Sequence, residues 1–334
     1  YASERGAGKQ YRDASRLDLP PYLPEEIASR PVLSIDEFRP EDSDLIFSAL
    51  PSGEARQLEP RVAEYLPVVS TTSAFRYEDD VPVLITEVNP MHAKLLRTQQ
   101  QRRRWKGFIA PEPNCTTVGL VMSLKPLYDA LGINRVVMTS YQAVSGAGYA
   151  ALVEWRGQRT SLELPRPFGE AFETPEDIFE GNVIGYIPEE EAKVRRETLK
   201  ILGQYQDGRI TPADFPIDSF CVRVPTYKGH LEAVFVEPSK SCSAEDVKSI
   251  YREFNKMNRE LFGGLPSSPE QTIVLLDREP QPRLDVGINN GMSAVIGRIE
   301  VSGGWIKYLV LTDNLRKGAA RGSIHVMEYL LREG

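Results

Sequence analysis

The feature that most constrains the fold is the apolar stretch from Cys115 to Gly132. Between these two residues the chain is dominated by Val, Leu and Met, and a small polar turn, Pro113-Asn114, precedes it. Such a pattern predicts a helix that begins near Cys115, ends at Gly132 and is buried on most of its sides. The helix must therefore lie inside the molecule, with other elements packed around it.

The composition excludes several classes of protein. With 334 residues, 41% of them hydrophobic and 26% charged, the chain is typical of a globular protein that can form two domains with sizeable cores. No apolar run is long enough to span a membrane and no signal peptide opens the chain, so we expect no membrane partner. A formal net charge of -7 argues against nucleic acid as a partner.

Cysteine and histidine usage points to a reducing compartment without a metal site. The three cysteines are odd in number and widely spaced, which disfavours a disulfide framework and indicates a cytoplasmic protein. The three histidines, His92, His230 and His325, lie far from each other in sequence and from any cysteine pair, so we predict no metal site.

Cys115 is a candidate nucleophile because of its place at the start of the apolar helix. Unpaired N–H groups and the positive end of a helix dipole favour a thiolate over a thiol, so the position predicts a lowered pKa for Cys115. The same N–H groups can stabilise a developing oxyanion. The alternative is a small buried cysteine with no chemical role.

Two motifs close together in sequence favour the nucleophile. The first is Asn114-Cys115-Thr116-Thr117, and the second is the strand 135–141 followed by the glycine-rich turn Gln142-Ala143-Val144-Ser145-Gly146-Ala147-Gly148. Together they resemble the aspartate-semialdehyde dehydrogenases, particularly the archaeal and fungal branch. The resemblance extends over nearly the whole chain.

The resemblance implies an α/β fold with two domains. Residues 1–114, completed by a C-terminal helix within 313–334, would form a Rossmann-type NADP-binding domain. Residues 115–312 would form an α+β catalytic and dimerisation domain with a mixed sheet and helices on one face, as in glyceraldehyde-phosphate-dehydrogenase-like enzymes. Independently, the alternation of short strands such as 67–70 with helical segments indicates an α/β sheet. We expect a homodimer or homotetramer.

The cofactor-binding residues follow from the same resemblance. Ser3, Arg5 and Lys9 would face the 2′-phosphate of NADP. The alternative is that these residues belong to a frayed, charged terminus with no binding role. The remaining candidates lie in small-residue loops or near the expected nicotinamide: Ser48, Ser145, Gly146, Gly148 and Asn314. No G-x-x-G-x-x-G precedes Tyr1, so we expect that the natural protein has further N-terminal residues and that this chain as written binds NADP weakly or not at all.

Two strands carry the next candidates. Strands 217–225 and 231–236 are joined by Thr226-Tyr227-Lys228-Gly229, which predicts a hairpin with Arg223 and His230 on one face as diagonal neighbours. The resemblance implies that Arg223 binds the substrate carboxylate and that His230 transfers a proton. It also implies that Gln142 orients the substrate or the thiol.

The other substrate-binding candidates are Glu190, Lys193, Arg76 and Asn114. Glu190 and Lys193 share one face of the helix expected from Pro188 to Gly203, and the resemblance assigns them to the substrate amine and to phosphate. An exposed ion pair explains the same spacing, and Glu191 could replace Glu190. Arg76 would bind phosphate, although a surface arginine in a loop is common.

The implied reaction is the reductive dephosphorylation of aspartyl β-phosphate by NADPH, which gives aspartate semialdehyde and phosphate through a Cys115 thioester. This reaction belongs to the biosynthesis of lysine, threonine and methionine. Two alternatives remain: a malonyl- or succinyl-CoA reductase, and a catalytically silent relative that serves as a structural or partner subunit. Residues 150–175 are expected to be an insertion of unknown role.

Overall fold

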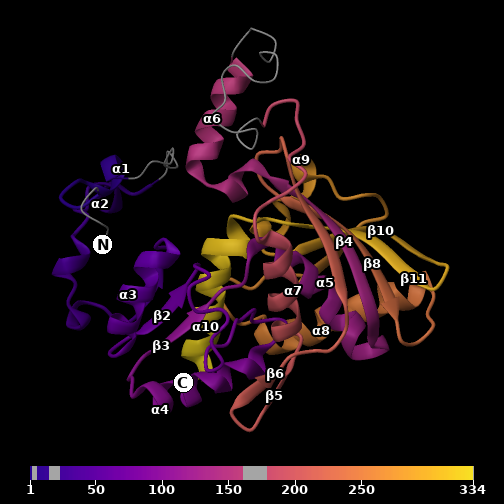
Figure 1. The fold of residues 1–334 in the computed structure, drawn as a ribbon, viewed down its shortest axis with the longest axis horizontal. Helices are drawn as coiled ribbons and strands as arrows, with labels where there is room; N and C mark the ends of the chain where they lie inside the picture. Colours follow the sequence, from indigo (N-terminus) through magenta and orange to yellow (C-terminus); the bar gives the residue numbers. More distant parts are fainter. Residues whose placement is uncertain (2–5, 15–22, 161–178, 334) are drawn as a thin grey trace. The chain divides into compact units, whose positions relative to one another are not determined.

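The computed structural model describes residues 1, 6–14, 23–160 and 179–333, which separate into two compact units, 1–46 and 47–334 (Figure 1). In the first unit the described residues form short helices and turns. Its helical segments are α1 (Tyr11–Ala14), α2 (Glu25–Ala28), η1 (Ile35–Glu37) and η2 (Pro40–Asp42). The exposed residue Lys9 lies in a backbone ladder with Val32, whose N–H donates to the Lys9 carbonyl (2.8 Å).

A three-stranded sheet precedes the catalytic helix in the chain. Its order is β1-β2-β3, and β2 and β3 are parallel, as the α/β prediction requires. The strands are β1 (Ile46–Ser48), β2 (Pro67–Ser70) and β3 (Phe108–Pro111), and the helical segments between them are α3 (Ser52–Ala63), η3 (Pro90–Lys94) and α4 (Leu95–Arg103). Strand β3 leads directly into the turn that carries Cys115.

A six-stranded sheet of order β7-β4-β8-β11-β10-β9 forms the centre of the second unit. It is mixed, because β4 and β7, and β9 and β10, are parallel while the other pairs are antiparallel. The predicted mixed sheet is therefore confirmed. The strands are β4 (Ile133–Ala143), β7 (Ile217–Val224), β8 (His230–Pro238), β9 (Ile273–Leu275), β10 (Ala294–Ser302) and β11 (Trp305–Thr312). A separate pair, β5 (Gln204–Gln206) and β6 (Arg209–Thr211), is antiparallel.

The predicted hairpin between β7 and β8 is wrong. Strand β4 lies between these two strands, parallel to β7 and antiparallel to β8. The connection between them crosses the end of β4, where the N–H groups of Val144 and Ser145 donate to the carbonyls of Thr226 (2.9 Å) and Tyr227 (3.3 Å). These bonds give the carbonyl groups of Thr226 and Tyr227 hydrogen-bond partners in the segment after β4. In a tight hairpin, the partners of such groups would instead lie within the turn itself.

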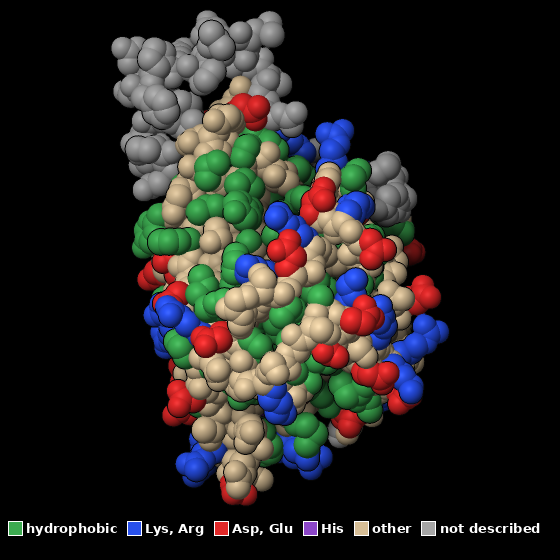
Figure 2. All heavy atoms as spheres, turned by 90° about the vertical axis from the view of Figure 1, so that its right-hand side faces the viewer, with side chains coloured by type: hydrophobic (Ala, Val, Ile, Leu, Met, Phe, Trp, Pro, Cys, Tyr) green, Lys and Arg blue, Asp and Glu red, His purple; other side chains and the backbone are tan. Residues whose placement is uncertain are grey.

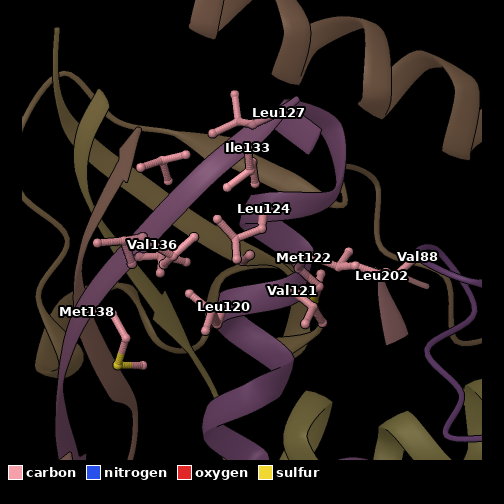
Figure 3. Close-up of a cluster of buried hydrophobic side chains, with 14 of the residues drawn as sticks. Val88, Leu120, Val121, Met122, Leu124, Leu127, Ile133, Val136, Met138 and Leu202 are labelled. Atoms are coloured by element: carbon pink, nitrogen blue, oxygen red, sulfur yellow. The ribbon is translucent and has the colours of Figure 1, made fainter. Parts of the chain in front are cut away.

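The apolar helix α5 (Cys115–Leu131) packs on one face of this sheet and begins and ends where the sequence predicts. Its side chains form one buried cluster with those of β4, including Leu120, Leu124, Val136 and Met138 (Figure 3). Gly132 ends the helix with φ +71°, a conformation that favours glycine. Helices α7 (Glu190–Ile201) and α8 (Ala244–Phe262) pack beside α5.

The other face of the sheet is not covered by helices of this chain in the described residues. Phe220, Tyr141 and Phe235 alternate with buried residues on β7, β4 and β8, and are 69%, 39% and 40% exposed. Figure 2, which views the molecule from the side of β8, β10 and β11, shows hydrophobic side chains exposed between charged ones. Within the described ranges no helix is long and apolar enough to cross a membrane.

Shorter helical segments complete the unit. Helix α6 (Tyr149–Thr160) occupies the first part of the expected insertion at 150–175, and the remainder, from residue 161, lies outside the described residues. The final helix α10 (Arg321–Glu333) follows a short π-helical turn. The other segments are η4 (Val144–Ala147), α9 (Pro282–Asp285), η6 (Ile288–Gly291) and η7 (Arg316–Ala320).

Candidate active site

Asn114 fixes the start of helix α5 and the position of Cys115. Its side-chain Oδ1 accepts from the N–H groups of Thr116 (2.9 Å) and Thr117 (3.3 Å), which caps the first turn. Cys115 is therefore the first helical residue, and its side chain is partly buried. The backbone N–H of Cys115 takes part in no hydrogen bond among the described residues.

Four polar side chains form a row across the sheet beneath this turn. Gln142 of β4 pairs with Arg223 of β7, and Thr312 of β11 pairs with His230 of β8. The pairing of Tyr141 with Leu231 places Gln142 level with His230. Paired residues point to the same face of a sheet, so the predicted catalytic and substrate-binding side chains of these strands lie together.

His230 contacts the cysteine directly. Its Nε2 atom lies 3.2 Å from Sγ of Cys115, and its Nδ1 atom accepts from the N–H of Ala143 (3.1 Å). Because Nδ1 is an acceptor, the neutral ring carries its proton on Nε2, which faces the sulfur. Complete burial, and the nearby guanidinium of Arg223, lower the pKa of His230 to about 3.

The predicted lowering of the Cys115 pKa is wrong. Burial, and then the carboxylate of Glu190, raise the pKa of Cys115 to about 12. The cations of Arg223 and Arg76 and the N–H of Thr116 act in the opposite direction and are outweighed. The resting site therefore holds a neutral thiol beside a neutral imidazole, and the thiolate has to form as the reaction begins.

Arg223 and Gln142 lie beside Cys115 and His230 and are joined to each other by a hydrogen bond. Arg223 donates through one terminal nitrogen to Gln142 Oε1 (3.3 Å) and to the Ala143 carbonyl (3.0 Å). Its other terminal nitrogen and its Nε atom take part in no hydrogen bond among the described residues. Gln142 is 1% exposed and donates to Ser140 and Glu190, so its amide is fixed in orientation.

Gly146 lies against the same groups. A Cβ atom at this position would lie 2.7 Å from Arg223 Nη1, so the end of that side chain would have to shift, and 3.0 Å from His230 Cε1, which is tighter than most real Cβ contacts. The turn that follows β4 thus approaches the catalytic pair only because residue 146 has no side chain.

Glu190 is 6% exposed, and three donors converge on its Oε1 atom: Asn114 Nδ2 (2.9 Å), Gln142 Nε2 (3.1 Å) and Thr116 Oγ1 (3.2 Å). Its Oε2 atom has no hydrogen bond among the described residues. The alternative, Glu191, accepts from the Cys221 N–H (3.2 Å), which supports the choice of Glu190. Lys193 lies on the same helix and is 3.8 Å from Glu189.

Arg76 is buried and paired with a residue that the sequence reasoning missed. It donates to Glu197 Oε1 (3.0 Å) and to the Thr71 carbonyl (2.9 Å). Glu197 is 1% exposed, and its Oε2 atom accepts from the N–H of Asn114 (2.5 Å). Glu197 lies seven residues after Glu190, which places both on one face of α7, but its role depends on Arg76 and Asn114, which are distant in sequence.

The cofactor-binding candidates are only partly brought together. Asn314 donates to Ser145 Oγ (2.9 Å) and accepts from the N–H of Gly229 (2.9 Å), one residue before His230. Gly148, with φ +94°, ends the same turn. Ser48 is buried at the end of β1 in the other sheet, and Lys9 belongs to the first unit. Ser3 and Arg5 lie outside the described residues.

No group of three or more His, Cys, Asp or Glu side chains arranged for a metal ion occurs among the residues that the structure describes.

Two family models match this chain. One, described as the NAD binding domain of semialdehyde dehydrogenase, matches residues 1–96, and the other, described as its dimerisation domain, matches residues 124–317. The chain is 38% identical to an aspartate-semialdehyde dehydrogenase of Methanothermobacter thermautotrophicus, covering 97% of this chain and 88% of that protein. It is 39% identical to the corresponding Archaeoglobus fulgidus protein, covering 99% and 89%.

Two further relatives extend the comparison. The chain is 30% identical to a malonyl CoA reductase (NADP) of Metallosphaera sedula, covering 100% of this chain and 89% of that protein. The crystal structure of aspartate semialdehyde dehydrogenase with NADP from Candida albicans superimposes with a TM-score of 0.80 at 31% identity, covering 99% of this chain and 89% of that one. The family resemblance inferred from the two sequence motifs is confirmed, and this chain belongs to the aspartate-semialdehyde dehydrogenase family of oxidoreductases.

Proposed function

We propose that this protein is an NADP-dependent enzyme that converts aspartyl β-phosphate to aspartate semialdehyde and phosphate, and catalyses the reverse reaction. The observation that carries the proposal is the contact between Cys115 Sγ and His230 Nε2 (3.2 Å) at the start of α5, with Arg223 beside it. A thiol, a hydrogen-bond donor and a carboxylate-binding cation are the groups that a semialdehyde substrate with a carboxylate requires.

In the oxidative direction, the Cys115 thiol loses its proton to water, the resulting thiolate attacks the aldehyde carbon, and an oxyanion develops on the aldehyde oxygen. The Nε2–H group of His230 and the N–H of Cys115 are the donors that stabilise this oxyanion. Loss of a hydride from the carbon then leaves an acyl thioester on Cys115. A phosphate oxygen attacks the thioester, which releases aspartyl phosphate and regenerates the thiolate, and the proton lost overall comes from phosphate.

NADP, when bound, supplies the hydride acceptor, and the residues beside the catalytic pair fit it. The turn Ser145–Gly148 lies directly against His230 because Gly146 has no side chain, and Asn314 joins this turn to Gly229. Small residues and amide groups of this kind allow a flat ring to approach the thioester carbon. Ser48 and Lys9, with Ser3 and Arg5, remain proposals for the rest of the dinucleotide.

Substrate recognition follows from the groups that the protein leaves without partners. Arg223 has two nitrogens outside the hydrogen bonds of the described residues, which permits a two-point contact with the substrate carboxylate. Glu190 Oε2 is similarly available for the substrate amine. Arg76 and Lys193 are assigned to phosphate, and Asn114 to orienting the cysteine turn and the substrate.

The domain division, assembly and location are also proposals. Residues 1–114 with the C-terminal helix would bind the dinucleotide, and residues 115–312 would carry catalysis and dimerisation. The open face of the six-stranded sheet, with Phe220 69% exposed, supports a homodimer formed through this face, and two such dimers would make the homotetramer. The free cysteines Cys115, Cys221 and Cys242 support a reducing compartment, the cytoplasm.

The test is a comparison of substrates with one enzyme preparation. NADP reduction is measured with aspartate semialdehyde and phosphate, beside NADPH oxidation with malonyl-CoA and with succinyl-CoA. The proposal expects the highest kcat/KM for aspartate semialdehyde, with strict dependence on phosphate. A higher value for malonyl-CoA would favour the reductase alternative, which the similarity to the Metallosphaera sedula protein supports. No turnover with any of the three would favour a silent relative.

A further inference from the structure

We propose that Glu197 is a positioning residue that joins the phosphate-binding arginine, Arg76, to the turn that carries Cys115. Both groups have to be placed with respect to each other, because the phosphate must attack the carbon held by the sulfur. The inference rests on the proposed function of Arg76 and assigns to Glu197 a role that no sequence motif indicated.

The two oxygens of the Glu197 carboxylate serve the two loops separately. Oε1 accepts from Arg76 Nη1 (3.0 Å) and from the hydroxyl of Tyr77 (3.2 Å). Oε2 accepts from the backbone N–H of Asn114 (2.5 Å), one residue before Cys115. One buried carboxylate thus holds the Arg76 loop and the cysteine turn against the same face of α7.

A second residue of α7 supports the same loop. Lys200, one turn after Glu197, donates through Nζ to the carbonyls of Arg76 (2.8 Å) and Glu78 (2.8 Å). Residues 190, 197 and 200 lie on one side of the helix, so the charged side chains of Glu190, Glu197 and Lys200 form a stripe along α7. Glu190 contacts the Asn114 side chain at one end of the stripe, and Lys200 holds the Arg76 backbone at the other.

A carboxylate is required at position 197 because all its partners are donors. An amide has one acceptor and one NH₂ group, so glutamine would place a donor against Arg76 and Tyr77 or against the Asn114 N–H. The Glu197→Gln variant removes little volume but breaks one of the two connections and leaves the Arg76 charge without its buried counterion.

The experiment compares Glu197→Gln with the matched control Glu191→Gln. Glu191 is a neighbour on the same helix whose carboxylate accepts a backbone N–H, that of Cys221, away from Arg76. Three quantities are measured: the KM for phosphate, the rate of Cys115 alkylation by iodoacetamide with and without inorganic phosphate, and the melting temperature. We expect Glu197→Gln to raise the phosphate KM about tenfold or more and to change the alkylation rate. Glu191→Gln should alter neither.

A double variant separates the two connections. If Glu197 acts on phosphate through Arg76, its effect on the phosphate KM should disappear in an Arg76→Gln background, while its effect on Cys115 alkylation should remain. Should Glu197→Gln fail to fold, Lys200→Met provides the second test. The hydrogen bonds of Lys200 go only to the carbonyls of Arg76 and Glu78, so this variant should raise the phosphate KM and leave the alkylation rate unchanged.

The inference is overturned if Glu197→Gln lowers the melting temperature but leaves the phosphate KM and the alkylation rate at wild-type values. It is also overturned if the effects of Glu197→Gln and Arg76→Gln on the phosphate KM are independent. If phosphate neither supports turnover nor protects Cys115 in the wild-type protein, the proposed function fails instead. The alkylation rate then still decides whether Glu197 positions the cysteine turn.

Discussion

Nε2 of His230 lies 3.2 Å from Sγ of Cys115, while Nδ1 of the same ring accepts the N–H of Ala143 at 3.1 Å. The backbone bond fixes the imidazole so that its proton faces the sulfur. His230 is therefore arranged to donate a hydrogen bond to a thiolate or to the oxyanion that replaces it. The same geometry opposes removal of the thiol proton by His230, because the nitrogen nearest the sulfur already carries a hydrogen.

The first prediction concerns the reactivity of Cys115 when no substrate is added. Burial and Glu190 raise its pKa to about 12, so the thiolate fraction at neutral pH is small and rises about tenfold per pH unit. The rate of alkylation by iodoacetamide, followed by mass spectrometry of the Cys115 peptide, should increase steadily from pH 7 to pH 10. A plateau near pH 8 would show an ordinary or activated thiol instead.

The second prediction tests the role of His230 as a donor. Glutamine can place an N–H group close to the position of Nε2, whereas alanine cannot. We expect His230→Ala to lower kcat about 10²–10⁴-fold and His230→Gln to retain a measurable part of the activity. Equal losses in the two variants would indicate that proton transfer by the ring is essential. Melting temperatures provide the control for folding.

The third prediction concerns Gly146. In Gly146→Ala the new methyl group would meet Arg223 Nη1 at 2.7 Å and His230 Cε1 at 3.0 Å, so both side chains have to move. The shift required at His230 is a few tenths of an ångström. Because a displacement of about 1 Å can cost about 10²-fold in rate, we expect this smaller shift to lower kcat by less than that. Gly264→Ala is the matched control, because its methyl group would meet nothing within 4 Å. Unchanged kinetics in Gly146→Ala would contradict the close packing of this turn.

The fourth prediction concerns stability. Glu87 is buried and lies 2.6 Å from Lys317 Nζ. Burial alone would raise the pKa of Glu87, but Lys317 and His325 outweigh it and hold this pKa below its usual value. A depressed pKa stabilises the fold above the unfolded-state value of about 4.3, and the contribution is lost as the pH falls.

Replacement of Lys317 by Met should therefore lower the free energy of unfolding by about 3–5 kcal/mol at pH 7, because a buried carboxylate loses its cation. The loss should be smaller at acid pH, where Glu87 can be protonated in the variant. Lys125→Met, which removes the partly exposed pair with Asp129 (2.8 Å), is the control and should cost less than about 1 kcal/mol. The free energy of unfolding of both variants is measured by urea denaturation at pH 7 and pH 4.5. If Lys317→Met and Lys125→Met lose the same free energy of unfolding at pH 7, the prediction is refuted.

Local patterns were sufficient to predict much of the fold and site. The helix from Cys115 to Leu131, capped by Asn114 and ended by Gly132, follows from its composition and its bounding residues. Local pattern also predicts the three strands, but it places Gln142 and His230 just outside the predicted strands 135–141 and 231–236, whereas β4 and β8 include them. These side chains meet because Gln142 and Arg223 lie near the C-terminal ends of β4 and β7, and His230 lies at the N-terminal end of β8. These three strand ends are neighbours in the sheet.

The errors arose where distant residues decide the outcome. The hairpin failed because β4, distant in sequence, pairs with both β7 and β8. The pKa of Cys115 was predicted in the wrong direction because burial and Glu190 outweigh the helix terminus, and neither effect can be read from the turn itself. Glu197 was missed because its partners, Arg76 and Asn114, are more than 80 residues away in sequence.

The measurement that tests the central claim most directly is the detection of an acyl group on Cys115. The protein is mixed with aspartate semialdehyde and NADP without phosphate, quenched in acid and analysed by intact and peptide mass spectrometry, with Cys115→Ser as the control. We predict one aspartyl adduct on the Cys115 peptide, formed together with one equivalent of NADPH and discharged by added phosphate. NADPH formation that continues at the same rate in Cys115→Ser, or an adduct on Cys221 or Cys242 instead, would contradict the account.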